Sequence, residues 1–275
     1  MERVVVVVLN WNGWQDTLRC VASLETLQGV RARILLVDNG STDGSVEQFK
    51  RHLPHIPLLE SGGNLGFGGG CNVGIRHALE SGAEYIWLVN NDADVAPDTL
   101  SAMVQLADTD TCLGAVGSVI YDGQQRDRVQ VWGGGQVNVW LGTSRHRLGP
   151  GHVDFLSGAS LLLRAQALRS VGLFDSDRFF MYWEDTDLGF RLRRAGWKLA
   201  VAPQSHVWHR ESSSLGQGTV QWDRMSAQSC VRFLRKHAPW PTLSVVAMMM
   251  RMLTKRLLLG RWDRAAAVWT AWRNA

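Results

Sequence analysis

The stretch "RVVVVVLNWNG" at residues 3–13 decides the fold, because five consecutive valines and a leucine end abruptly in polar residues and a glycine. A β-branched run bounded by turn formers predicts a buried strand. The stretch "ARILLVDNGSTDGS" at residues 32–45 repeats this pattern about 30 residues later, and "WQDTLRCVASLETL" between them has the apolar spacing of a helix. Strand, helix and strand form a βαβ unit, and strands that are apolar throughout are typical of a parallel sheet covered on both faces.

Two more strands are expected in the first half of the chain. The segment "HIPLLE" precedes the glycine-rich "SGGNLGFGGGCN" and a helix near residues 71–81, and "EYIWLVN" follows. After residue 112 the pattern becomes irregular, with "LGAVGSVIYD", "VQVWGGGQVN" and a strand and helix in "VDFLSGASLLLRAQALRSVG". We therefore expect an α/β fold whose Rossmann-like, mostly parallel central sheet is flanked by helices and continues into a mixed second half.

Polar side chains stand where these strands end, which in open α/β sheets is where ligands bind. They are Asn10, Asn12, Asp38, Asn39, Asn91, Asp92 and Asp94. A dinucleotide site is not indicated, because the first turn, "LNWNGWQD", lacks G-x-G-x-x-G, and the chain has no G-x-x-x-x-G-K-[ST] for a P-loop. Acidic groups stand in place of amides that would cradle phosphate.

The stretch "WLVNNDAD" at residues 87–94 has two interpretations. Asn and Asp at a strand end often make local turns and helix caps. Alternatively, Asp92 and Asp94 face a diphosphate through a hard cation, since Mg²⁺ or Mn²⁺ binds one or two carboxylates together with substrate phosphates. We favour the second interpretation because more acids follow downstream.

The stretch "FFMYWEDTDLGFRLRRAGW" at residues 179–197 carries Glu184, Asp185 and Asp187 among aromatic residues, which favour a raised carboxylate pKa through desolvation. The alternative is that the three acids only complement the start of a helix. Next, "VAPQSHVWHRESSS" offers His206 and His209, either as ordinary histidines or as metal ligands.

Taken together in this order, these motifs resemble the family 2 glycosyltransferases of the GT-A fold, and among them bacterial rhamnosyltransferases that use dTDP-rhamnose. The resemblance covers about residues 3–214. It implies a donor site for a dTDP- or UDP-sugar, in which Asp38 binds the pyrimidine, Asp92 faces the ribose and the sugar, and Asn72 orients the glycine-rich loop. The other residues it places at the nucleotide-sugar are Leu9, Asn10, Asn12, Asn39, Asn64, Gly66 and Asn91.

The same resemblance implies the chemistry. Asp94 is the main ligand of Mg²⁺ or Mn²⁺, with Asp92 and His209 contributing, and Asp185 is the catalytic base with Glu184 as the alternative base. The implied reaction inverts the anomeric centre in one displacement and moves a sugar to a glycan or polyprenyl-linked acceptor in cell-surface polysaccharide synthesis. The competing interpretations are a nucleotide-sugar-binding protein without turnover and a metal-dependent nucleotidyltransferase.

The basic charge of the chain is concentrated at its C-terminal end. Residues 231–275 hold nine Lys and Arg and one Asp, a net +8, whereas the whole chain carries +4. We divide the chain into a transferase domain at residues 1–225, with a nucleotide half at 1–107 and an acceptor half at 108–225, and a basic amphipathic tail at 226–275. On a helical wheel one side of the tail is apolar, with Val246, Met249, Met250, Leu253 and Leu257.

This tail has two interpretations as well. In the first, the tail lies on an anionic membrane surface, which suits a lipid-linked acceptor. In the second, it packs against protein, either the catalytic domain or a second copy of the chain. Nucleic acid is not an expected partner, because no recognition motif accompanies the charge. The start of the chain does not read as a signal peptide, so we expect a cytoplasmic protein, at the inner face of the membrane in the first interpretation.

Overall fold

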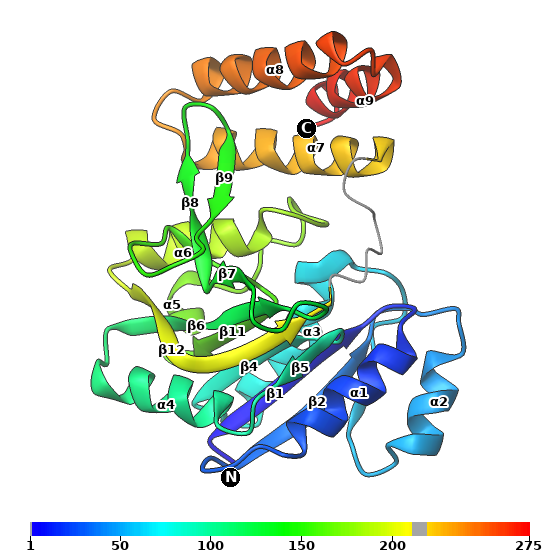
Figure 1. Cartoon of the computed structure of the whole chain (residues 1–275), viewed down its shortest axis with the longest axis vertical. Helices are drawn as coiled ribbons and strands as arrows, with labels where there is room; N and C mark the ends of the chain where they lie inside the picture. Colours follow the sequence, from blue (N-terminus) through cyan, green and yellow to red (C-terminus); the bar gives the residue numbers. More distant parts are fainter. Residues whose placement is uncertain (1, 211–218) are drawn as a thin grey trace.

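The computed structural model describes residues 2–210 and 219–275, and it confirms the predicted α/β fold (Figure 1). The strands are β1 (Val4–Asn10), β2 (Ala32–Asp38), β3 (Leu58–Glu60), β4 (Tyr85–Asn90), β5 (Ala93–Val95), β6 (Leu113–Asp122), β7 (Val129–Trp132), β8 (Gly134–Asn138), β9 (Thr143–His146), β10 (Phe155–Leu156), β11 (Ser160–Arg164) and β12 (Lys198–His209). The helices are α1 (Trp14–Leu24), α2 (Ser45–His52), α3 (Gly66–Glu80), α4 (Thr99–Thr109), α5 (Ala165–Val171), α6 (Glu184–Arg194), α7 (Val220–His237), α8 (Pro241–Leu258) and α9 (Trp262–Arg273).

One mixed sheet runs through both halves of the chain. Its order is β3-β2-β1-β4-β11-β6-β12-β5, with β7 added beside β6. The strands from β3 to β4 are parallel, so β1, β2 and β4 end at one edge. Strand β11 then runs antiparallel to both β4 and β6, while β12 is parallel to β6. The second half therefore continues the first sheet, as predicted.

Each face of the sheet carries its own apolar core. Val4, Val6 and Val8 of β1 point to the side covered by α1, α2 and α4. Val5 and Val7 point to the opposite side, which α3, α5 and α6 cover. The continuous valine run is thus explained by alternation, because successive side chains of a strand point to opposite faces and both faces are buried here.

The glycine-rich segment differs from the prediction. We expected a loop before a helix near residue 71, but α3 already begins at Gly66 and includes this segment. The glycines let the helix approach the sheet, since a Cβ on Gly74 would lie 2.4 Å from Val7 Cγ1 and one on Gly70 would lie 2.5 Å from Leu9 Cδ1. Helix propensity alone argues against five glycines in one helix, and close packing on β1 outweighs it.

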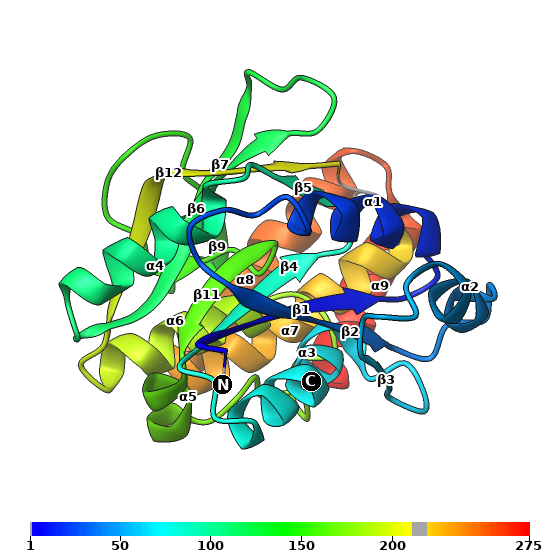
Figure 2. The same ribbon diagram turned by 90° about the horizontal axis from the view of Figure 1, so that it is seen from below.

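The C-terminal helices form a further layer beyond α6, at the end of the molecule far from α1 and α2 (Figures 1 and 2). Helices α7, α8 and α9 share a core with Phe179, Trp183 and Phe190. The turn of the β8–β9 hairpin enters this layer, because Gly142 packs against side chains of α7 and α8. The tail thus packs on the acceptor half, which was one of the two alternatives, and its first helix begins at Val220, before the predicted boundary at residue 226.

The apolar side predicted for the tail is not the buried one. Helix α8 buries Val245, Met248, Met249 and Met252 toward α7 and α9. Of the residues predicted to share one apolar side, Met249 is buried and Leu253 is partly buried, but Val246, Met250 and Leu257 are exposed. The apolar side of the helix is wider than the part that is buried, and a helical wheel could not decide which part faces the protein.

Candidate active site

The ends of β1 and β2 bring Asn10 and Asp38 together, as the parallel register of these strands requires. Asn10 Nδ2 donates to Asp38 Oδ1 at 2.9 Å, and the Ser41 hydroxyl and backbone N–H donate to the two oxygens of the same carboxylate at 2.6 and 2.9 Å. Asn91, from the end of β4, donates to Asn10 Oδ1 at 3.3 Å. Three predicted donor-site residues therefore form one hydrogen-bonded group, which Ser41 joins.

A second group lies at the start of α3. Asn39 donates to Asn64 Oδ1 at 3.2 Å and to the Gly66 carbonyl at 3.1 Å, and it accepts from the Leu65 N–H at 3.1 Å. Asn12 has a left-handed φ of 52° and accepts from the Thr42 N–H at 2.7 Å. Asn39 thus holds the loop after β2 against the start of α3, and Asn12 joins the loops after β1 and β2.

Asn72 makes contacts different from those expected. It is buried, and its amide donates to the Phe174 carbonyl at 2.8 Å and accepts from the Phe174 N–H at 3.0 Å. Both of its polar groups contact the acceptor half, so Asn72 joins α3 to that half.

Asp92 and His209 meet at the ends of β4 and β12. His209 Nε2 lies 3.0 Å from Asp92 Oδ1 and 3.1 Å from Asn90 Nδ2, while Nδ1 lies 3.3 Å from Gln130 Oε1. Asp94 instead contacts Arg210, whose terminal nitrogen lies 2.8 Å from Asp94 Oδ2. Arg210 was not among the predicted site residues, although it directly follows His209 in the same motif. His206 lies away from this group and contacts the Pro203 carbonyl.

The group at the ends of β4 and β12 offers few ligands for a divalent cation. Within residues 2–210 and 219–275, no three His, Cys, Asp or Glu side chains gather closely enough to hold a metal ion alone. Asp92 and His209 nevertheless offer an oxygen and a nitrogen side by side, and Asp94, two positions after Asp92, lies on β5. Since Mg²⁺ and Mn²⁺ complete their coordination with water and substrate phosphates, this donor set fits a cation that arrives with a diphosphate.

Glu184 and Asp185 begin α6, directly after two non-glycine residues in left-handed conformation. Tyr182 and Trp183 have φ values of 68° and 70°, and such strained backbone occurs preferentially at functional sites. Asp185 accepts from the Gly158 N–H at 3.2 Å and from the Thr186 N–H at 2.6 Å. Glu184 is buried, and its Oε2 has no hydrogen-bond partner among the described residues.

The surroundings of Glu184 and Asp185 raise the pKa values of both carboxyl groups, but not from the same set of causes. Burial, followed by the charge of Asp185, raises the pKa of Glu184 to about 8. Burial also raises the pKa of Asp185, but the Gly158 N–H, His146 and Thr186 oppose this shift. Both carboxyl groups therefore resist ionisation, and Glu184, which receives no opposing hydrogen bond from another of the described residues, does so more strongly.

A short path of hydrogen bonds joins Asp185 to Asp92 and His209, which we call the strand-end group. Gly158, which donates to Asp185, precedes Ala159, and the Ala159 carbonyl accepts from the Asn90 N–H at 3.0 Å. Asn90 in turn contacts His209. Asp185 thus belongs to the same edge of the sheet as Asp92 and His209.

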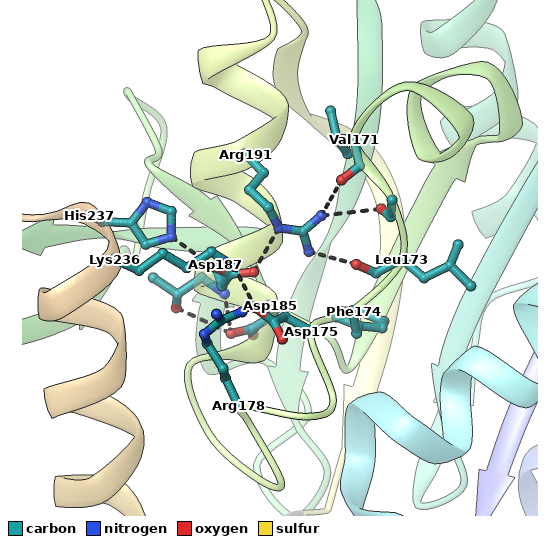
Figure 3. Close-up of polar contacts among 12 residues, drawn as sticks. Val171, Leu173, Phe174, Asp175, Arg178, Asp185, Asp187, Arg191, Lys236 and His237 are labelled. Atoms are coloured by element: carbon teal, nitrogen blue, oxygen red, sulfur yellow. Dashed lines mark hydrogen bonds and ion pairs between the residues drawn. The ribbon is translucent and has the colours of Figure 1, made fainter. Parts of the chain in front are cut away.

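Asp187 is structural. Its carboxylate is fully buried and receives Arg191 Nε at 2.7 Å, Lys236 Nζ at 2.8 Å and His237 Nε2 at 2.7 Å (Figure 3). Burial opposes ionisation, but the His237 hydrogen bond and the Arg191 charge lower the pKa of Asp187 to about 2. This residue connects the helix that carries the candidate base to α7.

Comparison with known proteins places these features in a family. The glycosyl transferase family 2 model matches residues 4–172. An N-acetylglucosaminyl-diphospho-decaprenol L-rhamnosyltransferase of Mycobacterium tuberculosis is 32% identical over 86% of this chain and 85% of its own length. The galactofuranosyltransferase GlfT1 of Mycolicibacterium smegmatis is 33% identical over 59% of this chain and 56% of its own.

Solved structures show the same fold at lower identity. A Pyrobaculum calidifontis mannosyltransferase in complex with GDP-Man and Mn²⁺ has a TM-score of 0.62 and 20% identity, over 98% of this chain and 74% of the other. GalNAc-T7 with UDP, GalNAc and Mn²⁺ has a TM-score of 0.66 and 16% identity, over 83% and 47%. The family match and the rhamnosyltransferase relative together show that this chain belongs to glycosyl transferase family 2 and is a glycosyltransferase.

Proposed function

We propose that this chain transfers a sugar, most simply rhamnose from dTDP-rhamnose, to a lipid-linked acceptor with inversion of the anomeric centre. The observation that carries the proposal is the placement of Asp185, a carboxylate held by the Gly158 N–H at the sheet edge where Asp92 and His209 meet. The choice of sugar rests on the rhamnosyltransferase relative, whose name also includes a diphospho-decaprenol acceptor.

In this proposal Asp185 removes the proton from the attacking acceptor hydroxyl. A carboxylate in this role typically contributes about 10²- to 10⁴-fold to the rate. Protonated Glu184 beside it adds no second negative charge at neutral pH, so the developing oxyanion of the acceptor meets one carboxylate instead of two. Asn10, Asn12, Asp38 and the group around Asn39 shape the nucleotide side.

Asp92, Asp94 and His209 would hold Mg²⁺ or Mn²⁺ together with the donor diphosphate. The cation would offset the charge that grows on the leaving diphosphate, which is worth several kcal/mol in such sites. Arg210 contacts Oδ2 of Asp94 and so lies beside this proposed cation site. The Mn²⁺ complexes among the fold neighbours support a divalent metal.

A membrane surface is the proposed location of the acceptor. No helix within residues 2–210 and 219–275 is long and apolar enough to span a bilayer. The outward side of α8 carries exposed Leu243, Val246, Met250 and Leu257, and exposed Trp240 and Trp262 lie at its two ends. Apolar and aromatic side chains beside basic ones favour an anionic interface, at the inner face of the cell membrane in cell-surface polysaccharide synthesis.

The experiment that tests the function is a donor panel with Mg²⁺ or Mn²⁺, comprising dTDP-rhamnose, UDP-glucose, UDP-galactose, UDP-N-acetylglucosamine and GDP-mannose. We expect one donor to be turned over with a synthetic N-acetylglucosaminyl diphosphate lipid, activity to be lost on chelation, and NMR to show an inverted anomeric centre in the product. Asp185→Asn should lose transfer by about 10²-fold or more while donor binding remains.

Asp177→Asn is the matched control, because Asp177 is an exposed aspartate in the loop before α6. Retained turnover in Asp185→Asn would contradict the assignment of the base. Donor binding with no transfer to any acceptor would favour a nucleotide-sugar-binding protein, and release of pyrophosphate from a nucleoside triphosphate and a sugar phosphate would favour a nucleotidyltransferase.

A further inference from the structure

A strongly basic pocket of about 560 Å³ lies away from the strand-end group, between β9, α7 and α8. Five cationic side chains line it: Arg251, Lys255, Arg256, Arg261 and Arg264. Nothing in the donor chemistry proposed above uses these residues.

The charge of the pocket is only partly compensated. Asp223 of α7 is buried and accepts hydrogen bonds from Arg256 and Arg264, so one carboxylate serves two of the cations. Arg251 donates to the Leu141 and Gly142 carbonyls at 3.3 and 3.2 Å. No carboxylate of the described residues lies within ion-pair distance of Lys255 or Arg261, and both side chains are exposed. A concentration of cations of this kind favours an anionic ligand with several acceptor oxygens.

The pocket adjoins the candidate base. Trp183, which lines it, directly precedes Glu184 and Asp185. Thr143 and Ser144 line it from β9. Trp222 adds a second aromatic side chain to the lining. A molecule in the pocket can therefore extend past aromatic residues, which suit stacking with a sugar ring, toward the carboxylate.

The opposite rim of the pocket is apolar. Leu259 lines the pocket and is exposed, and its neighbours Leu258 and Trp262 are 82% and 70% exposed. They continue the exposed apolar side of α8, with Met250 and Leu257. A soluble protein rarely leaves so many large apolar side chains together without a binding role. The pocket thus has cations in its interior and apolar side chains at its mouth.

We propose that this pocket holds the diphosphate of a polyprenyl diphosphate-linked acceptor, with Lys255 and Arg261 contacting the diphosphate, the prenyl chain leaving over Leu258 and Leu259, and the sugar pointing past Trp183 toward Asp185. This assignment rests on the proposed function for the identity of the acceptor sugar, and on the pocket itself for the diphosphate and the chain. A neutral glycan would not form ion pairs with the cationic side chains, and a free anion would not contact the apolar side chains at the rim.

The first test is binding in the absence of chemistry. Geranyl diphosphate is titrated into the full chain by calorimetry with EDTA present, so that metal-dependent donor binding does not contribute. We expect binding that weakens as salt is raised, and a loss of about tenfold or more in affinity in the double variant Lys255→Gln, Arg261→Gln, since two charge-assisted contacts are removed. Arg235→Gln, an exposed arginine of α7 outside the pocket, is the control and should bind as the unmodified protein does.

Two further probes separate the sources of the anion. Inorganic pyrophosphate should bind more weakly than geranyl diphosphate, because it lacks the chain, and geraniol should not bind measurably. Equal affinity for pyrophosphate and geranyl diphosphate would overturn the lipid part of the proposal. Unchanged geranyl diphosphate binding in the double variant would overturn the assignment of the pocket.

The second test is kinetic and keeps the two proposals apart. With a diphosphate-linked acceptor, the double variant should raise the acceptor KM by about tenfold or more, with a smaller change in kcat. Transfer with an unchanged acceptor KM would refute the pocket while the transferase function stands. Absence of transfer from every donor, with geranyl diphosphate binding still lost in the double variant, would refute the proposed function and leave the anion site intact.

Discussion

Substitution of Asp187 by Asn tests how the catalytic helix is held in the molecule. The Asp187 carboxylate has no solvent exposure and receives Arg191, Lys236 and His237 at 2.7 to 2.8 Å (Figure 3). Asn keeps the shape of the side chain and removes its charge. Arg191 of α6 then loses its counter-charge, Lys236 of α7 keeps only its ion pair with Asp175, and the contact between these helices weakens.

The expected loss of unfolding free energy follows from the lowered pKa of Asp187 and from the burial of its carboxylate. A carboxyl with a pKa of 3.8 in the unfolded chain and about 2 in the native protein contributes about 2 kcal/mol to the free energy of unfolding at neutral pH. Removal of one partner from a buried ion pair typically costs about 3–5 kcal/mol. We therefore expect Asp187→Asn to lower the free energy of unfolding by about 3 kcal/mol.

The pH dependence has a defined sign. Because the native pKa of Asp187 is depressed, its stabilisation is fully present above pH 3.8 and is lost as the pH falls through about 2. The difference between the unmodified protein and the variant should stay constant from pH 7 down to pH 4 and shrink below that.

The assay is urea unfolding followed by far-UV circular dichroism, with Asp263→Asn as control. Asp263 is an exposed aspartate in the first turn of α9, and its substitution should change the free energy by about 0.5 kcal/mol or less. A loss below about 1 kcal/mol in Asp187→Asn, or one equal to the control, would refute the argument that this carboxylate joins α6 to α7.

Three further predictions concern the sheet, the metal and the second acid. Gly74→Ala should destabilise the protein by about 1–3 kcal/mol in urea unfolding, because the new Cβ would lie 2.4 Å from Val7 Cγ1. Gly63→Ala is the control and should not destabilise it, because there is open space around Gly63. Equal stability of the two variants would argue against close packing of α3 on β1. His209→Ala should weaken binding of Mn²⁺ with dTDP by about tenfold or more in calorimetry, and unchanged affinity would remove His209 from the proposed metal site. As the pH rises from 4.5 to 8, Glu184→Gln should become progressively more stable than the unmodified protein, by up to about 1.4 kcal/mol per pH unit. The reason is that the raised pKa of Glu184 makes its ionisation costly to the native state. A stability difference that does not change with pH would contradict the raised pKa.

The strand-end residues were predictable because period and polarity are local properties of the sequence. Parallel strands that start in register end at the same edge, so Asn10, Asp38 and Asn91 had to meet once β1, β2 and β4 were recognised as neighbours. The order of the motifs then indicated the family, which the comparisons confirmed.

Contacts between the two halves of the chain could not be predicted in this way. Asn72 reads as a donor-site residue from its position in a glycine-rich motif, yet its partner is the backbone of Phe174, which is distant in sequence. Arg210 likewise contacts Asp94 because β12 pairs with β5. The spacing of these residues in the sequence does not predict that pairing.

The sequence by itself determined the four parallel strands of the nucleotide half, the polar side chains gathered at their ends and the presence of a basic amphipathic tail. Only the tertiary structure decided that α3 begins within the glycines, that Glu184 is buried beside Asp185, and that α8 turns Met248 and Met252 inward and Met250 outward. The physical reason is the same in each case. Propensity and periodicity act over a few residues, whereas burial and pKa depend on which surface, distant in the chain, packs against a side chain.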